Sequence, residues 1–133
     1  MNVVLSIKPK WAKKIYAGEK TIEWRKFFPR QHYIGDVIFL YESAPVKMVT
    51  GYIRIDSYKW IYSIKDDDIK NGCVPLDDLK KYFGEKTIFG YKIKKAVKFS
   101  KCYPIKFFSK SGKAPQSFLY TDITIKTLKR GES

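Results

Sequence analysis

The segment that decides how this chain is interpreted reads Gly18-Glu19-Lys20-Thr21-Ile22-Glu23-Trp24-Arg25-Lys26. From Thr21 to Phe27 the residues alternate in character, which predicts a β-strand whose successive side chains point to opposite faces. One face would carry residues suited to a core, with a lysine at its end: Ile22, Trp24 and Lys26. The other would carry polar residues: Thr21, Glu23 and Arg25.

The polar face of this strand brings a carboxylate and cations together. Glu23 and Arg25 would lie roughly 6 to 7 Å apart at a rise of about 3.3 Å per residue, and Lys20 enters at the turn before the strand. A carboxylate flanked by two cations stays ionised and can accept hydrogen bonds from a base edge. Arg25 offers a planar fork for a phosphate or a guanine-like edge. The alternative interpretation is a solvated ion pair on an exposed strand, which would contribute little.

The residues before this segment predict a strand followed by a helix. Val3 to Ile7 is apolar and β-branched, which is typical of a strand. Pro9 suits the first position of a helix, and apolar residues recur at helical spacing as far as Ala17. Gly18 follows where helices commonly end in a left-handed residue. The polar strand is therefore expected directly after a short helix.

The residues after this segment predict a strand-rich domain. Further strands are expected over residues 37–41, 48–60, 87–103 and 119–128, and short helices over 66–71 and 76–83. Gly51 marks a candidate β-bulge, and residues 104–108 could extend the strand before them. This pattern predicts an α+β fold: a small, mostly antiparallel β-barrel or curled sheet, with a helix after the first strand and short helices in the middle. We expect a single domain over residues 1–128 and a frayed tail over residues 129–133.

The composition indicates a nucleic-acid partner. The 133 residues carry 27 Lys plus Arg against 13 Asp plus Glu, a formal charge of +14, and 17% of them are aromatic. A polyanion would relieve the self-repulsion of such a charge. Rings for bases and cations for phosphates are what the binding of single-stranded RNA requires. An anionic membrane is the second candidate partner. The alternative to both is a lysine-rich surface that has no specific binding role.

Cysteine and histidine usage argues against a metal or cofactor. The chain has two cysteines, Cys73 and Cys102, outside any Cys-x-x-Cys pair, and one histidine, His32. This set is too small for a zinc site with the usual ligands. Asp66-Asp67-Asp68 invites a magnesium site, but acidic residues at a helix amino terminus complement the helix dipole, which explains them better. We therefore expect no metal and no cofactor.

The sequence shows neither a leader nor a membrane signal. The apolar run near the amino terminus is too short for a signal peptide, and no stretch reaches transmembrane length. Isolated cysteines indicate a reducing compartment. A cytoplasmic protein without membrane association is predicted, with no expectation about a protein partner.

Three separated motifs resemble the ASCH domain family, within the PUA-like superfamily. Lys8-Pro9 opens a helix after a strand, and Gly18-x-Lys20-x-x-Glu23-x-Arg25 follows in the pattern of the family signature. Gly35-Asp36-Val37 is similar to the start of the family's third strand, and Ala114-Pro115-Gln116-Ser117-Phe118-Leu119-Tyr120 is similar to its carboxy-terminal element. The resemblance covers nearly the whole chain. It implies a β-barrel with helices around a cleft, and a cleft that binds RNA.

The resemblance also implies which residues line that cleft. Matched position by position, and with Lys26 added from the end of the strand, the expected binding residues are Lys8, Lys20, Glu23, Arg25, Lys26, Gln116, Ser117 and Tyr120. Gly18 matches the family's turn. Trp11 would border the cleft as well, although its position in the helix suits a core residue equally.

Resemblance to enzymes of the superfamily leaves catalysis open. Some small members are amidohydrolases that deacetylate acetylated cytidine, with a lysine matching Lys20 and a threonine where this chain has Glu23. Thr21 could supply the missing hydroxyl. As a base, Lys20 would need a lowered pKa, which the neighbouring carboxylate would oppose. Another member is held to be a ribonuclease, a reaction for which Glu23 with Lys20 and Arg25 could supply a base and cations.

The function predicted from sequence is an RNA- or nucleotide-binding domain with a basic cleft, in a regulatory, translation-linked or RNA-metabolism role. The alternative is a nucleic-acid-processing hydrolase, either a ribonuclease or a modified-nucleoside amidohydrolase, with Lys20 and Glu23 as catalytic residues. The third hypothesis is a protein-interaction adaptor that uses exposed aromatic residues. Tyr58, Trp60 and Tyr62 alternate on a predicted strand and fit either a stacking ladder or a core face.

Overall fold

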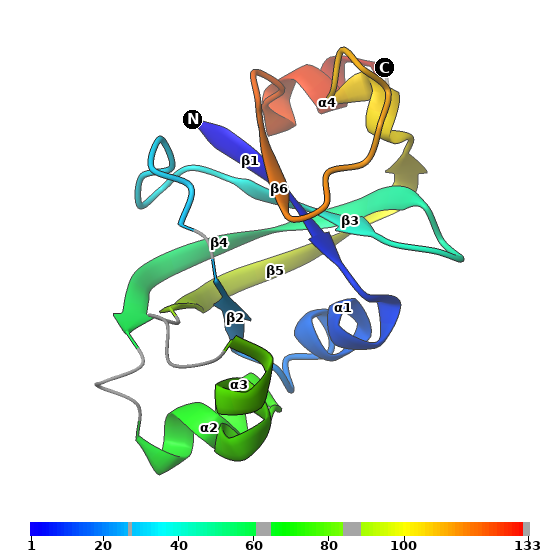
Figure 1. Ribbon diagram of the computed structural model, residues 1–133. Coiled ribbons are helices and arrows are strands. Elements are labelled where there is room, and N and C mark those ends of the chain that lie inside the picture. The colour runs from blue at the N-terminus through cyan, green and yellow to red at the C-terminus, as the bar shows by residue number, and fades with distance from the viewer. Residues whose placement is uncertain (27, 61–64, 84–88, 132–133) are drawn as a thin grey trace.

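The computed structural model describes residues 1–26, 28–60, 65–83 and 89–131. In this part of the chain six strands form one sheet in the order β2-β5-β4-β3-β1-β6 (Figure 1). The strands are β1 (Asn2–Ile7), β2 (Ile22–Arg25), β3 (Ile38–Glu42), β4 (Met48–Trp60), β5 (Phe89–Tyr103) and β6 (Phe118–Thr121). The helices are α1 (Pro9–Tyr16), α2 (Asp66–Gly72), α3 (Leu76–Phe83) and α4 (Ile125–Gly131), with a 3₁₀ turn η2 (Ile105–Phe107).

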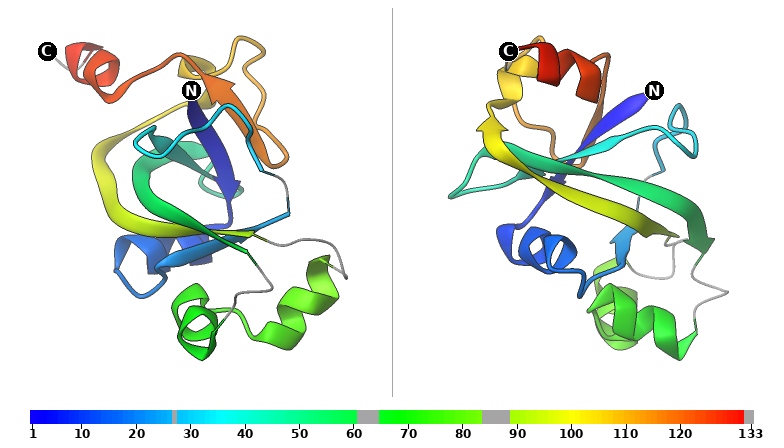
Figure 2. Two further views of the ribbon diagram at one scale, coloured as in Figure 1. Left: turned by 90° about the vertical axis from the view of Figure 1, so that its left-hand side faces the viewer. Right: turned by 180° about the vertical axis from the view of Figure 1, so that it is seen from behind.

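The sheet is curled and mostly antiparallel, as the sequence pattern predicts. Among the described strands β1 and β3 run parallel, and the other neighbouring pairs run antiparallel. Figure 2 shows β4 and β5 bending together, so that the sheet forms a half-barrel with β2 and β6 at its two ends. The predicted α+β class, the helix after the first strand and the short helices in the middle are confirmed.

The sheet carries a hydrophobic core on each face, because successive residues of a strand point to opposite sides. Leu5 and Leu40 belong to a cluster that α1 covers with Ala12 and Ile15. Their strand neighbours belong to a second cluster on the other face, with residues of α4 and of the turn after β5: Val4, Phe39, Phe108 and Leu128. Continuous apolar runs in β1 and β3 follow from burial on both faces.

The short helix α1 begins and ends where its residues predict. Pro9 stands in its first turn, and the chain leaves the helix through Gly18 at a φ of +79°, a conformation that glycine adopts readily. The hydroxyl of Tyr16 lies 2.8 Å from that of Thr50 in β4. Next to it, the partners of Leu40 and Tyr41 in β3 are Gly51 and Val49 in β4, so β4 has one extra residue at this point, as the predicted bulge at Gly51 requires.

Two predictions for the carboxy-terminal part are wrong. The predicted strand over residues 119–128 is the short strand β6 followed by α4, because the Thr124 side chain accepts a hydrogen bond from the Thr127 backbone N–H at 3.1 Å and caps a helix. Residues 104–108 do not extend β5, since Pro104 lacks an N–H and a 3₁₀ turn follows it. Helix α4 runs to Gly131 and residues 132–133 lie outside the described residues, so the frayed tail stays a prediction.

The aromatic residues of β4 that sequence leaves open belong to the edge of the first core. Tyr58 packs edge-on against Phe28, and Trp60 packs against Phe89. Both are half-buried, and the Tyr58 hydroxyl lies 2.8 Å from Nδ1 of His32, which makes His32 a structural residue. Tyr62 lies outside the described residues. The structure therefore favours the core interpretation over a stacking ladder at these two positions.

The expectations of no metal site and no membrane-spanning segment can be compared only with the residues that the structure describes. Within these ranges there is no group of three His, Cys, Asp or Glu side chains that could hold a metal ion. Asp68 accepts a hydrogen bond from the Lys65 backbone N–H at 2.9 Å and pairs with Lys59 at 3.1 Å. Its role is therefore to stabilise the amino terminus of α2. None of the described helices is long and apolar enough to cross a membrane.

Candidate functional site

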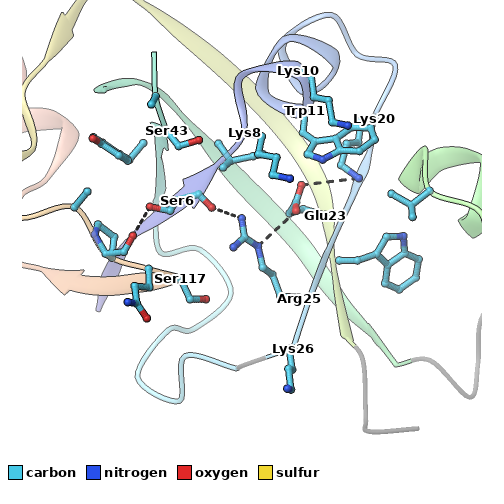
Figure 3. Close-up of a pocket in the computed structure, with 18 of the residues that line it drawn as sticks. Ser6, Lys8, Lys10, Trp11, Lys20, Glu23, Arg25, Lys26, Ser43 and Ser117 are labelled. Atoms are coloured by element: carbon cyan, nitrogen blue, oxygen red, sulfur yellow. Dashed lines mark hydrogen bonds and ion pairs between the residues drawn. The ribbon is translucent and has the colours of Figure 1, made fainter. Parts of the chain in front are cut away.

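One cavity of about 710 Å³ gathers most of the residues that the sequence singles out. It lies between the end of β1, the start of α1, strand β2, the turn after β3, helix α3 and the loop before β6 (Figure 3). Seven predicted binding residues line it: Lys8, Lys20, Glu23, Arg25, Lys26, Gln116 and Ser117. Tyr120 does not line it; its hydroxyl accepts a hydrogen bond from the Gln31 backbone N–H at 3.0 Å.

Strand β2 turns its polar face to this cavity. Ile22 and Trp24 form a small cluster with Leu79 of α3, on the side of β2 that faces the middle helices. Figure 3 shows Glu23 and Arg25 among the side chains that line the cavity. The strand is shorter than predicted, Ile22–Arg25. Alternation correctly places Ile22 and Trp24 in one cluster, but Trp24 and Lys26 line the cavity together with Glu23 and Arg25.

Lys20, Glu23 and Arg25 form a row of charges in which Lys20 and Glu23 are buried and Arg25 is half-buried. The Lys20 Nζ lies 3.9 Å from Oε2 of Glu23, and the Arg25 Nε lies 3.5 Å from Oε1. Lys20 is 2% exposed and Glu23 is 6% exposed, so this is not the solvated ion pair of the alternative interpretation. The outer nitrogens are also engaged: Lys20 Nζ donates to the Gly72 carbonyl, and Arg25 Nη2 donates to the Ser6 carbonyl.

The Glu23 carboxylate is left with spare accepting capacity. Its Oε2 is buried and accepts no hydrogen bond from any described residue, although Lys20 is its ion-pair partner. A buried polar atom in this condition costs free energy until a donor reaches it. A ligand in the cavity could supply this donor, because Glu23 lines the cavity.

Burial lowers the pKa of Lys20 below its ordinary value, and the nearby Glu23 carboxylate raises it by less. The sequence predicts the effect of Glu23 on this pKa, but the larger effect of burial depends on the tertiary structure. Lys20 loses hydration beneath the Trp11 ring, whose centroid is 5.2 Å from Nζ. The objection to Lys20 as a base is therefore weaker than the sequence suggests.

Four exposed lysines at the cavity, which we call the rim lysines, surround this row of charges: Lys8, Lys10, Lys26 and Lys47. Aromatic side chains of Trp11, Trp24 and Tyr41 also line the cavity. Asp78 of α3 brings a carboxylate to the same lining. The cavity thus combines a cationic opening, aromatic walls and a carboxylate in its floor.

Sequence reasoning misses several lining residues from β1 and from the turn after β3. Ser6 donates from Oγ to the Pro115 carbonyl at 2.6 Å, and its N–H donates to the Ser117 carbonyl at 2.9 Å. These bonds hold the late loop against β1. Ser43 and Lys47 come from the turn after β3. The one available signal was Ser6, a single polar residue inside an apolar strand.

The sequence model of the ASCH domain family matches residues 5–107. The chain belongs to the ASCH domain family. This family has a PUA-like fold that is associated with RNA binding. No curated protein sequence matches this ASCH chain.

Solved structures agree with this ASCH domain in fold. The ASCH protein of Zymomonas mobilis superposes with a TM-score of 0.80 at 19% identity, over 98% of this chain and 93% of that one. A serine-to-alanine variant of the same protein gives 0.80 at 18% identity, over 98% and 94%. The hypothetical protein PH0355 gives 0.52 at 18% identity, over 73% of this chain and 100% of that one. At these identities the likeness shows the fold alone.

Proposed function

We propose that the cavity binds one nucleotide of single-stranded RNA, with the base against Glu23 and Lys20 and the phosphates at the rim lysines. The observation that carries this proposal is the buried Glu23 Oε2, which lacks a hydrogen-bond donor among the described residues and lines a cavity with a cationic opening.

A base suits the floor of the cavity better than a phosphate does. A buried carboxylate repels phosphate oxygens but accepts hydrogen bonds from the amino and imino N–H groups of a base. Lys20, 3.9 Å away, supplies a donor beside this acceptor. An adjacent donor and acceptor match the edge of an unpaired base. The Trp11 ring at the same place offers an aromatic face.

Phosphates suit the opening of the cavity. The rim lysines are exposed and belong to a chain whose formal charge is +14. Cations in this position attract the backbone of a single strand and release its counterions. The volume of about 710 Å³ lies within the range of about 300–1,000 Å³ that is typical of small-molecule sites.

A salt titration of binding to single-stranded RNA tests this function. We expect log K to fall with log salt with a slope of about −0.7 for each phosphate contacted. Glu23→Gln keeps the side-chain volume but removes the charge, and should weaken binding tenfold or more, since hydrogen bonds to charged groups contribute about 1.5–3 kcal/mol. Glu19→Gln is the matched control because Glu19 is exposed and lies outside the cavity lining. Absence of binding, or binding whose affinity does not change with salt concentration, would contradict the proposal.

The lowered pKa of Lys20 favours one second candidate, a hydrolase that acts on RNA or on an acetylated nucleoside. A buried amine beside a carboxylate is the kind of group that general-base catalysis uses. Incubation with RNA and with acetylated cytidine, comparing the wild type with Lys20→Met and Glu23→Gln, tests it. Product formation that both substitutions leave unchanged would remove these residues from any reaction.

A further inference from the structure

The loop between β2 and β3 presents two large apolar side chains to solvent. Tyr33 is 68% exposed and Ile34 is 52% exposed, and we call this pair the tip. Gly35 follows at a φ of +102°, which turns the chain back toward β3. In Figure 1 the loop stands out from the sheet beside the amino terminus of the chain.

The tip is held from beneath by a buried residue. His32, directly before it, is 2% exposed. Its Nδ1 lies 2.8 Å from the Tyr58 hydroxyl, and its Nε2 lies 3.2 Å from the Asp36 carbonyl. The Tyr58 hydroxyl also donates to the His32 carbonyl at 3.2 Å. The residue next to the tip is thus fixed to β4.

Further hydrogen bonds fix both flanks of the tip. The Asp36 carboxylate accepts from the Tyr33 backbone N–H at 2.9 Å, and the Gly35 carbonyl accepts from Arg54 Nη1 at 2.7 Å. On the other side the Gln31 N–H donates to the Tyr120 hydroxyl at 3.0 Å. A loop tied at these points loses little entropy when something binds to it. The tip is therefore a preorganised contact surface.

The charges around the tip indicate what kind of partner it fits. Arg30 is exposed three positions before Tyr33, and Arg54 donates to the Gly35 carbonyl at the other end of the tip. The nearby Asp36 carboxylate is paired with the Met1 ammonium at 2.8 Å, and the same segment begins at the rim lysine Lys26. A planar ring with cations beside it is the combination that binds single-stranded nucleic acid. A protein partner would favour a larger apolar patch without charges at its centre.

We infer that Tyr33 stacks on a second base of the RNA strand whose first base occupies the cavity. The inference rests on the proposed function and extends it from one nucleotide to a strand. Tyr33 follows Lys26 by seven positions along the chain, which limits the distance between them to about 25 Å at about 3.6 Å per residue. Ten nucleotides span about 34 Å even at the helical rise of 3.4 Å, which is enough to reach both places.

The test compares a ten-nucleotide single-stranded RNA with a nucleoside monophosphate, by fluorescence anisotropy and competition. Tyr33→Ala should weaken binding of the ten-nucleotide RNA about tenfold or more, the loss expected for one base–aromatic stack, and leave the monophosphate unchanged. Tyr33→Phe should keep binding within about twofold. Phe107→Ala is the matched control, because Phe107 is also an exposed aromatic residue, at 54%, in the turn after β5.

The outcomes separate the two proposals. If Glu23→Gln weakens the binding of both ligands while Tyr33→Ala changes neither, the tip inference is overturned and the cavity proposal stands. If Tyr33→Ala and Phe107→Ala weaken RNA binding equally, the effect is unspecific and the inference is overturned as well. A change of self-association in Tyr33→Ala without RNA, seen by size-exclusion chromatography, would make the tip a protein contact instead. Failure of Glu23→Gln alone would count against the cavity.

Discussion

The Lys20 amine lies 3.9 Å from the Glu23 carboxylate in the row of charges, and its pKa is nevertheless lowered. Loss of hydration around the ammonium outweighs the attraction of the carboxylate. Burial of this pair therefore costs folding free energy, and it gives a ligand in the cavity charged groups to contact.

Removing one member of the pair should harm the fold more than removing both charges. Lys20→Met leaves Glu23 with Arg25 alone, and we expect a loss of about 3 kcal/mol in the free energy of unfolding, the scale found for broken buried pairs. The double variant Lys20→Met/Glu23→Gln should recover most of that loss while it fails to bind RNA. Urea unfolding of the four proteins of the cycle measures this coupling. Strictly additive changes would contradict the account of the pair.

Acidification should destabilise the fold through His32. Burial lowers the pKa of His32 below 6.5, and the hydrogen bond and charge of Asp36 oppose this only in part. The unfolded chain therefore binds the proton more readily, so this contribution to stability is complete above pH 6.5 and is lost as pH falls toward the folded-state pKa.

Thermal melts between pH 7 and pH 5 measure this effect, in a range where ordinary carboxylates stay ionised. His32→Asn should be less stable than the wild type at pH 7, because it loses contacts to Tyr58. Its melting temperature should, however, change less with pH over this range. An equal slope in both proteins would assign the pH dependence to other groups.

Gly51→Ala should disturb the packing of α1 on the sheet. A Cβ at this position would overlap the Val97 carbonyl and would stand 2.6 Å from the Tyr16 hydroxyl. Because the first of these atoms is backbone, we expect a loss of about 2–4 kcal/mol. Gly112→Ala meets no atom within 4 Å, and its φ of +68° should cost only about 1–2 kcal/mol. Denaturant unfolding of the two variants should show this difference, and equal losses would argue against the overlap.

Neutralising rim lysines should change the salt dependence of RNA binding. Lys10→Gln and Lys47→Gln should each reduce the slope of log K against log salt by about 0.7 if each lysine neutralises one phosphate. Lys80→Gln, an exposed position on α3 outside the cavity lining, should leave the slope unchanged. If all three substitutions reduce the slope alike, the protein attracts RNA by its total charge and not by the cavity opening.

Local sequence patterns predict most of the elements of this fold. Strand β4 (Met48–Trp60) and helix α3 (Leu76–Phe83) match their predicted ranges, because their apolar periods and flanking glycine or proline residues act over short distances. Helix α4 was missed since its start depends on one threonine side chain that could equally have continued a strand. The alternation around Glu23 was also local, and it correctly assigned Ile22 and Trp24 to one face of β2 and Glu23 and Arg25 to the other.

The chemistry of the site depends on contacts that no local pattern contains. The sequence by itself determined that a carboxylate and two cations stand on one short strand and its preceding turn. Only the tertiary structure decided that Ser6 and Ser117 close the same cavity, because β1 lies between β3 and β6 in the sheet. It also decided the direction in which the pKa of Lys20 shifts: a neighbour in sequence brings the carboxylate, but burial under Trp11 and against Gly72 removes water that would stabilise the charged ammonium.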